Sequence, residues 1–212
     1  MDLASIAASA AIAASAASPA SLPPPVGQPA PLTRADAPAY VVGEQWTFKY
    51  VNELEPSKNS TYTQSVSSVE GGRAIINGGA TVLDANANLV KLGPASYEPS
   101  DGKLRFPLRV GDSWTSSYAY RTGTWEALGQ RQTTVVGVER VDTSAGSFDA
   151  FKLEQVVSWS AGGGNKAEGR TREQDWYAPA VGRIVKADFV DQETRVAPTT
   201  THVELVKFSK PQ

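Results

Sequence analysis

Two pairs of side chains have the types and spacing of an acid–base centre. His202, the single histidine of the chain, stands two residues before Glu204, so on a strand both side chains lie on one face. A carboxylate beside an imidazole can orient a general base. Glu173 and Asp175 share the same spacing, and two carboxylates on one face could serve glycoside hydrolysis.

Neither pair comes with the other residues that such chemistry requires. No serine stands in a Gly-x-Ser-x-Gly motif that His202 could activate. Arginines at positions 170 and 172 flank the two carboxylates in sequence, and charges of both signs along one strand are typical of a solvated outer face. We therefore expect no catalytic residue and no enzymatic activity.

One acidic segment resembles the start of a calcium-binding loop. Asp84, Asn86 and Asn88 have the required spacing, but Leu89 stands where the loop needs glycine and Ala95 where it needs glutamate. Aspartate and asparagine favour short turns closed by their own side chains. The chain also has no cysteine. The sequence thus indicates a turn here, no metal site and no cofactor.

Aromatic side chains are the remaining candidates for binding. They form two stripes at alternate positions, each after a repeated phrase, VGEQWT at residues 42–47 and VGDSWT at residues 110–115. Stripes that face each other would form a core, whereas stripes on an open, curved sheet would line a groove for an apolar or sugar ligand. The six candidate groove residues are Trp46, Phe48, Tyr50, Trp114, Tyr118 and Tyr120.

The elements that carry these residues have the pattern of strands. Residues 44–51 alternate apolar and polar side chains, and many similar short segments follow between glycine- and proline-rich turns. About ten to twelve strands fit between residues 40 and 208 at the usual spacing. Residues 93–102 have the pattern of a loop and residues 103–108 that of a strand. We predict an all-β fold, an antiparallel sandwich or (half-)barrel, with each repeated phrase as a turn that begins a strand.

Charge and length set the broad class. The chain has 212 residues with 20 basic and 22 acidic side chains, a net charge of −2, which gives no basic stripe for nucleic acid. Residues 40–212 are expected to form a single antiparallel β domain. Residues 1–39 differ from it, because they are rich in alanine, serine and proline.

The N-terminal segment has two interpretations. Residues 3–17 have the apolar core of a signal peptide, although no lysine or arginine precedes them as an n-region requires. This interpretation predicts an exported protein, periplasmic or extracellular. The alternative is a disordered leader whose composition cannot bury enough apolar surface to fold. The run is too short and too serine-rich for a transmembrane segment.

Three phrases in order resemble a known family. FPLRVGDSW (residues 106–114), AGSFDAFK (145–152) and WYAPAVG (176–182) are similar to motifs of uncharacterised exported bacterial β-proteins with a domain of unknown function. Those proteins often have proline where this chain has Ser144, and glycine where it has Ala180. The resemblance covers roughly residues 40–190. It implies an antiparallel β-fold in the cell envelope and no catalytic residues.

The expected function follows from these exclusions. We expect an exported β-domain protein of the periplasm or cell envelope with a non-enzymatic binding or structural role. The alternative is a periplasmic carrier that holds an apolar or lipid-like ligand in the aromatic-lined groove. The expected partner is an apolar small molecule or an envelope protein.

Overall fold

The computed structural model describes residues 31–162, 167–194 and 196–211. Most of the predicted leader, residues 1–30, lies outside the described residues. The compact β unit begins at Leu32, earlier than the predicted start at residue 40. Ala35 is buried, and its backbone exchanges hydrogen bonds of 3.1 and 2.8 Å with Leu108. Residues 32–39 are therefore part of the domain.

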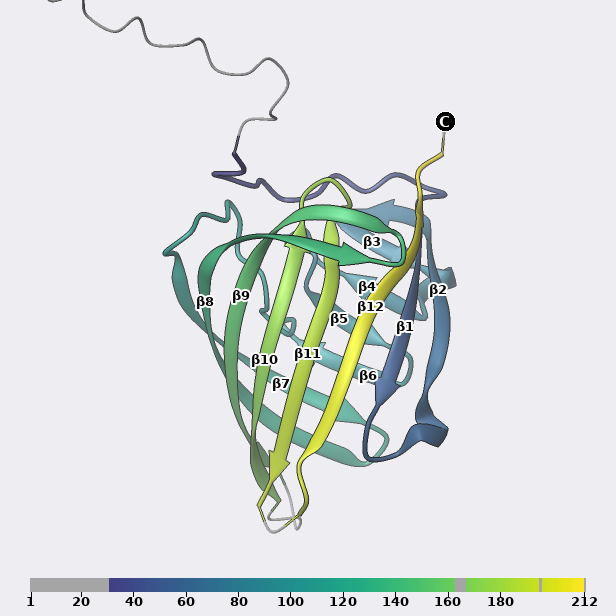
Figure 1. Cartoon of the computed structure of the whole chain (residues 1–212). Coiled ribbons are helices and arrows are strands. Elements are labelled where there is room, and N and C mark those ends of the chain that lie inside the picture. Colours follow the sequence, from purple (N-terminus) through teal and green to yellow (C-terminus); the bar gives the residue numbers. More distant parts are fainter. Residues whose placement is uncertain (1–30, 163–166, 195, 212) are drawn as a thin grey trace, which may run out of the picture. The chain divides into compact units, whose positions relative to one another are not determined.

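Within these residues, twelve strands form one closed antiparallel barrel, in which each strand pairs with its neighbours in sequence and β12 pairs with β1 (Figure 1). This confirms the predicted all-β fold and selects the barrel over the sandwich. The strands are β1 (Gln45–Asn52), β2 (Ser60–Glu70), β3 (Arg73–Ile76), β4 (Thr81–Leu83), β5 (Leu89–Leu92), β6 (Ala95–Glu98), β7 (Ser113–Thr122), β8 (Trp125–Thr143), β9 (Gly146–Ala161), β10 (Glu168–Ala178), β11 (Arg183–Glu193) and β12 (Thr199–Ser209). Two short 3-10 helices, η1 (Pro56–Lys58) and η2 (Asn77–Gly79), lie between strands. In the part of the chain described, no helix is long and apolar enough to cross a membrane.

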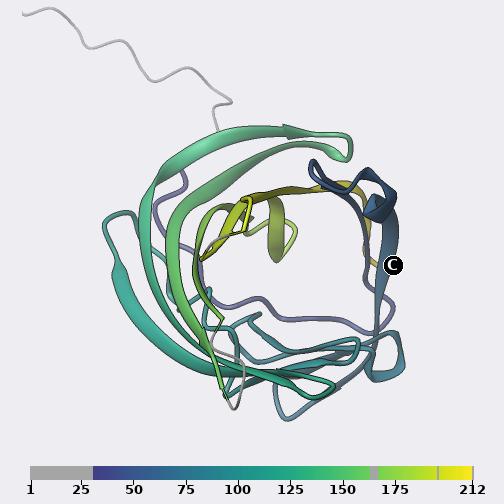
Figure 2. The same cartoon turned by 90° about the horizontal axis from the view of Figure 1, so that it is seen from below.

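Side-chain alternation divides each long strand between the lumen and the solvent. On β8, Arg131, Thr133 and Val135 are buried, whereas the intervening outward positions are more exposed. Closure removes the unpaired edges that an open sheet would offer to other chains. Figure 2 looks along the barrel from the end opposite the chain's C-terminus and shows the strands as a ring. Alternate residues of every long strand therefore face one shared interior.

The repeated phrase has the same role in both copies. Gly43 donates its backbone N–H to the Val66 carbonyl at 2.9 Å, and Gly111 donates its own to the Val135 carbonyl at 2.8 Å. Both glycines have a positive φ, +89° and +91°, which residues other than glycine rarely adopt. The following acid accepts a hydrogen bond from the backbone three residues earlier, with Asp112 Oδ2 2.9 Å from the Arg109 nitrogen. The phrase is a strand-entry turn, as predicted.

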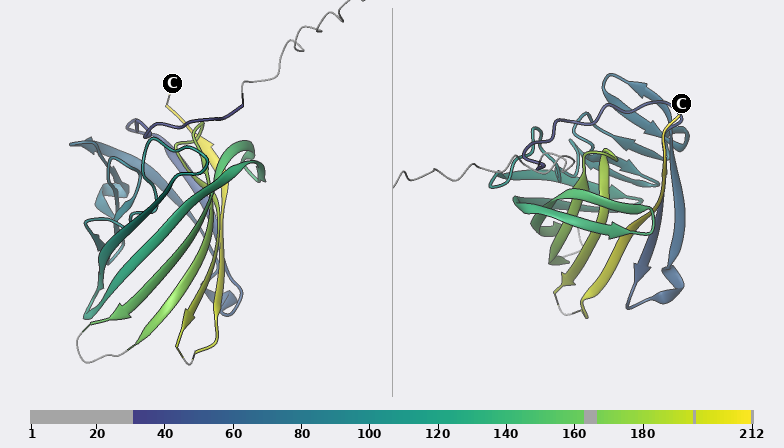
Figure 3. Two further views of the ribbon diagram at one scale, coloured as in Figure 1. Left: turned by 90° about the vertical axis from the view of Figure 1, so that its left-hand side faces the viewer. Right: turned by 45° about the horizontal axis from the view of Figure 1, so that its top comes forward.

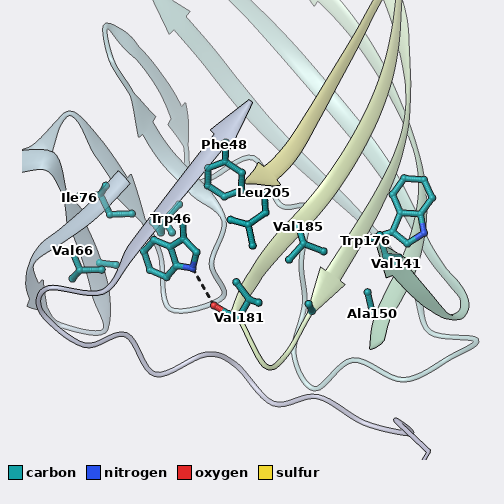
Figure 4. Close-up of a cluster of buried hydrophobic side chains, with 13 residues drawn as sticks. Trp46, Phe48, Val66, Ile76, Val141, Ala150, Trp176, Val181, Val185 and Leu205 are labelled. Carbon is teal, nitrogen blue, oxygen red and sulfur yellow. Dashed lines mark hydrogen bonds between the residues drawn. The ribbon is translucent and has the colours of Figure 1, made fainter. Parts of the chain in front are cut away.

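Two apolar clusters fill the end of the barrel at which β1 begins. The first surrounds Trp46, whose indole N–H donates to the Val181 carbonyl at 3.2 Å (Figure 4). The second contains Trp114, Phe151 and Tyr177. The segment before β1 runs across this same end (Figure 3). One end of the lumen is thus closed by core packing and covered by the chain.

The prediction for residues 93–108 is wrong in two places. Residues 95–98 form β6 within the expected loop, and residues 103–108 form a loop instead of a strand. Residues 103–108 do not pair with a strand because the side chain of Asn88 takes up the backbone hydrogen bonds of Leu104. Asn88 Oδ1 accepts from the Leu104 nitrogen at 2.7 Å, and Asn88 Nδ2 donates to the Leu104 carbonyl at 2.9 Å. The loop is therefore fixed inward against β5 without joining the sheet.

The strand-entry turn predicts a stability effect at Gly111. We expect Gly111→Val to lower the free energy of unfolding by about 2 kcal/mol, because a β-branched side chain is strained at this positive φ. Trp114→Ala should cost about 3–5 kcal/mol through the cavity it leaves. Urea unfolding followed by circular dichroism measures both.

Gly137→Ala is the matched control, since Gly137 has no positive φ and an added Cβ would meet nothing within 4 Å. A Trp114→Ala protein that unfolds at the parent's urea midpoint would contradict the assignment of the phrase to the fold.

Candidate functional site

The candidate site is a cluster of charged side chains inside the barrel. The cross-strand register places Thr133, Gln155 and Glu173 side by side on β8, β9 and β10. Glu173 is 6% exposed and Asp175 is fully buried. The expectation of a solvated face for these two carboxylates is therefore wrong. Arg170 and Arg172 alternate with them on β10 and are the outward ones, since Arg172 is exposed.

The inward loop supplies the cation that faces these carboxylates. Asp101 Oδ1 accepts a hydrogen bond from the Leu89 nitrogen at 3.0 Å, and the Asp101 nitrogen donates to the Leu89 carbonyl at 2.8 Å. Together with the bonds between Asn88 and Leu104, these contacts hold the backbone on both sides of Lys103. The Lys103 side chain is thereby directed into the lumen.

The charged groups form a connected network. Lys103 Nζ lies 2.6 Å from Glu173 Oε2 and 3.3 Å from Asp175 Oδ2. Arg131 Nη1 donates to the same Glu173 oxygen at 2.8 Å and to Gln155 Oε1 at 2.9 Å. The Gln155 amide donates in turn to Asp175 Oδ2. Four segments far apart in the sequence therefore meet in one buried network.

Burial and charge separate the two carboxyl groups. Burial alone would raise the pKa of Glu173, but Arg131 and Lys103 outweigh it and hold that pKa below its usual range. Burial raises the pKa of Asp175 to about 6, and the nearby Lys103 offsets only part of this increase. The surroundings therefore favour the ionised form of Glu173 and the protonated form of Asp175. Asp175 Oδ1, moreover, has no hydrogen-bond partner among the described residues.

A cavity of about 430 Å³ lies in the lumen beside this network. Aromatic and aliphatic side chains form much of its wall, and its charged members are Asp101, Lys103, Asp175, Arg183 and Asp191. This volume and this mixture are typical of small-molecule sites. The apolar part of the wall includes Phe48, Tyr50, Tyr62, Leu83, Leu89, Ile184, Phe189 and Val203.

Two larger hollows lie on the outer face of the sheet, with volumes of about 910 and 670 Å³. Outward polar residues such as Gln130, Ser158 and Gln174 line them. Together their linings draw on strands β6 to β12, and most of the lining residues are polar or charged. The lumen cavity is the better candidate for a ligand site, because its wall is largely aromatic and aliphatic.

The structure distributes the six candidate groove residues over three places. Phe48 and Tyr50 line the lumen cavity. Trp46 is fully buried and Trp114 is 8% exposed, each within an apolar cluster, so these two belong to the core. The remaining two, Tyr118 and Tyr120, are half-buried on β7. The two predicted stripes do not line one continuous groove.

Tyr118 and Tyr120 belong to a second aromatic group. Tyr97 contacts both rings, Tyr120 contacts Trp125, and Trp125 contacts Trp159, with centroid separations of 5.2 to 6.0 Å. The Tyr118 ring lies directly over Gly129 of β8, where a Cβ would be only 2.5 Å from the ring. The glycine is what allows the ring to lie flat on the sheet.

The histidine pairing also differs from its prediction. His202 contacts Asp188 and Glu53, at 2.7 and 2.9 Å, whereas Glu204 accepts hydrogen bonds from Ser144. The side chain is about two-fifths exposed. Its hydrogen bonds to the two carboxylates raise the pKa of His202. The segment at Asp84 forms the expected turn, with Asp84 Oδ1 accepting from the nitrogens of Asn86 and Asn88.

Sequence reasoning missed Asp101, Lys103, Arg131 and Gln155. Arg131, Thr133 and Val135 occupy every second position of β8 and therefore share one face of the strand. This period-two pattern is the signal that could have placed Arg131 inside the barrel. Lys103 offers no such signal, because it lies in a loop.

Comparison with known proteins supports a β-protein family without an assigned function. Residues 126–201 match the model of a family described as DUF3108-like. Two of the three phrases that carry the resemblance, at residues 145–152 and 176–182, lie inside this segment, and the third precedes it. No curated protein has a matching sequence.

Three solved structures are similar to this chain at low sequence identity. A Bacteroides fragilis protein described as exported, with a YmcC-like fold, has a TM-score of 0.50 and 16% identity, over 83% of this chain and 100% of its own. A Parabacteroides distasonis protein described as a lipoprotein has a TM-score of 0.47 and 11% identity, over 80% of this chain and 96% of its own. The hypothetical lipoprotein YmcC of Escherichia coli has a TM-score of 0.45 and 11% identity, over 81% and 91% of the two chains.

The raised pKa of Asp175 predicts a pH-dependent stability. In the folded protein Asp175 takes up a proton near pH 6, whereas in the unfolded chain it does so only near the ordinary aspartate pKa of 3.8. Its contribution to stability is therefore full below pH 3.8 and is lost as the pH rises through 6. Relative to the parent, the Asp175→Asn protein should gain about 1.4 kcal/mol more stability at pH 8 than at pH 5.

Urea unfolding of parent and variant across this pH range measures the difference. Asp149→Asn is the control, because it removes a carboxylate by the same substitution at a half-exposed position beside Arg140, outside the buried network. Parallel pH profiles for the parent and Asp175→Asn would contradict the assignment.

Proposed function

We propose that the protein is a non-enzymatic carrier that binds an apolar small molecule in its barrel lumen. The observation that carries the proposal is the lumen cavity, in which an aromatic and aliphatic wall encloses a volume suited to a small ligand. Core packing closes one end, so a ligand can be shielded from water on several sides.

The charged network supports a binding role over catalysis. Glu173 is engaged by both Lys103 and Arg131, and Asp175 by Lys103 and Gln155. Hydrogen-bonded ion pairs of this kind hold side chains in fixed positions. The network thus acts as a rigid polar wall of the cavity.

We also propose that the protein acts outside the cytoplasm. The signal-like pattern of residues 3–17 supports export. The Bacteroides fragilis protein of similar fold, which is described as exported, supports the same location.

A blocked cavity should lose binding of a neutral apolar probe. Ala187 is buried on β11 and lines the cavity, so Ala187→Phe places a ring in the space a ligand would occupy. We expect the affinity for 1-N-phenylnaphthylamine, read by its fluorescence increase, to fall about tenfold, equivalent to roughly 1.4 kcal/mol.

Val190→Phe is the matched control, because Val190 lies on the same strand, faces outward and is 41% exposed. It adds an aromatic ring without entering the lumen and should bind the probe as the parent does. Equal loss in both variants, or no saturable binding by the parent, would contradict the carrier proposal. A thermal melt of each variant shows that the fold is retained.

Export has its own test. In its host, the full-length chain carrying a C-terminal tag should appear in the fraction released by osmotic shock or in the culture medium, with a mass lower than that of the full chain. Retention in the cytoplasmic fraction at full mass would contradict this part of the proposal.

A further inference from the structure

Arg183 occupies the end of the cavity nearest the core. It begins β11 and lines the cavity, and its guanidinium lies 5.0 Å from the Trp46 ring and 5.6 Å from the Phe48 ring. Its Nη2 donates to Gln64 Oε1 at 2.8 Å, across the lumen on β2. Two aromatic rings and one neutral amide thus surround this cation.

This guanidinium has no anionic partner in the described part of the chain. Among the described residues, no carboxylate forms an ion pair with Arg183, and its buried Nη1 has no hydrogen-bond partner. A buried polar group without a partner costs about 1–3 kcal/mol, and more when it is charged. Such a cost is explained if a partner arrives from outside the chain.

Most of the other charged groups around the lumen have ionic or hydrogen-bonded partners. Lys103 and Arg131 both pair with Glu173, and Asp191 accepts hydrogen bonds from Trp159 and Thr171. Asp175 also has one oxygen without a partner. A carboxyl group, however, can bind a proton, whereas a guanidinium cannot lose one within a protein. Arg183 is the charge that only a second molecule can satisfy.

Beyond Arg183, one side of the cavity wall is apolar. Phe48, Tyr62, Leu83 and Ile184 belong to this apolar part of the lining, and Phe48 lies beside the guanidinium. Further along β11, Phe189 continues this surface, six residues and about 20 Å from Arg183. Positive charge at the closed end and apolar surface leading away from it define the shape of a complementary ligand.

We propose that the lumen binds an amphiphile, with a compact anionic head group paired to Arg183 and an apolar tail along Tyr50, Phe189 and Val203. The head group is a carboxylate or a phosphate monoester, either of which matches the two-pronged geometry of a guanidinium. This inference rests on the carrier function proposed above and adds the chemical class of the ligand.

Competition among matched ten-carbon ligands tests the head group. Decanoate, decyl phosphate, 1-decanol and decyltrimethylammonium are each used to displace 1-N-phenylnaphthylamine from the parent protein. We expect at least one of the two anions to bind about ten- to a hundredfold more tightly than 1-decanol, the gain of a charge-assisted hydrogen bond. The comparison of decanoate with decyl phosphate identifies the anion that fits.

Variants of Arg183 assign the preference to this residue. Arg183→Gln keeps a hydrogen-bonding side chain but removes the charge, and should reduce the preference for the anion over 1-decanol to less than threefold. Arg183→Lys keeps the charge without the fork and should retain part of the preference. Arg172→Gln, on the exposed face of β10, removes the same charge outside the lumen and should leave the preference unchanged.

The outcomes separate this inference from the carrier proposal. A parent that binds the probe but prefers neither anion over 1-decanol overturns the anionic head group and leaves the carrier function standing. A parent that does not bind the probe at all overturns both. A preference that survives in Arg183→Gln shows that another group binds the head. If Arg183→Gln does not fold, the parent's preference and its partial loss in Arg183→Lys decide the question.

Discussion

Barrel closure is the constraint on which the rest of the structure depends. Because β12 pairs with β1, the sheet has no free edge, and half of the residues on each long strand must face a common lumen. An apolar side chain at a lumen-facing position must pack against others, and a polar or charged one needs a hydrogen-bonded or ionic partner inside the barrel. Trp46 and Trp114 meet this demand by packing, whereas Glu173 and Asp175 meet it with ion pairs.

The lumen is consequently divided along its length. Core clusters fill the end near the start of β1, the charged network forms one wall, and an apolar cavity remains beside it. If stability were the only requirement, well-packed apolar residues could replace a buried ion network at little or no cost in folding free energy. That this lumen instead has a cavity and a guanidinium with no anionic partner argues for a ligand.

Sequence patterns predicted the parts of the fold that depend on local chemistry. Period-two alternation identified an all-β domain, and the repeat at residues 42–47 and 110–115 identified two equivalent strand entries. Alternation also placed Glu173 and Asp175 on one face of a strand, but it could not say which face. Arg170 and Arg172 suggested the outer face for them, because partners supplied by residues 103 and 131 are invisible in a local window.

The site was harder to predict because its members come from distant segments. Lys103 points inward only because Asn88 and Asp101 take the place of strand partners for the loop that carries it. Of the six aromatic candidates, Phe48 and Tyr50 reach the cavity, because the curvature and closure of the sheet decide which aromatics meet. Neither the curvature of the sheet nor the cross-strand register can be predicted from a single local segment of the sequence.

Intermolecular nuclear Overhauser effects from a bound ligand test the central claim most directly. The protein is titrated with uniformly ¹³C-labelled decanoate, and contacts between ligand methylene protons and protein side chains are recorded. We expect contacts to the rings of Phe48, Tyr50 and Phe189, all of which line the lumen. Contacts confined to outward residues of β8 to β11, such as Val136 and Val190, would contradict this expectation.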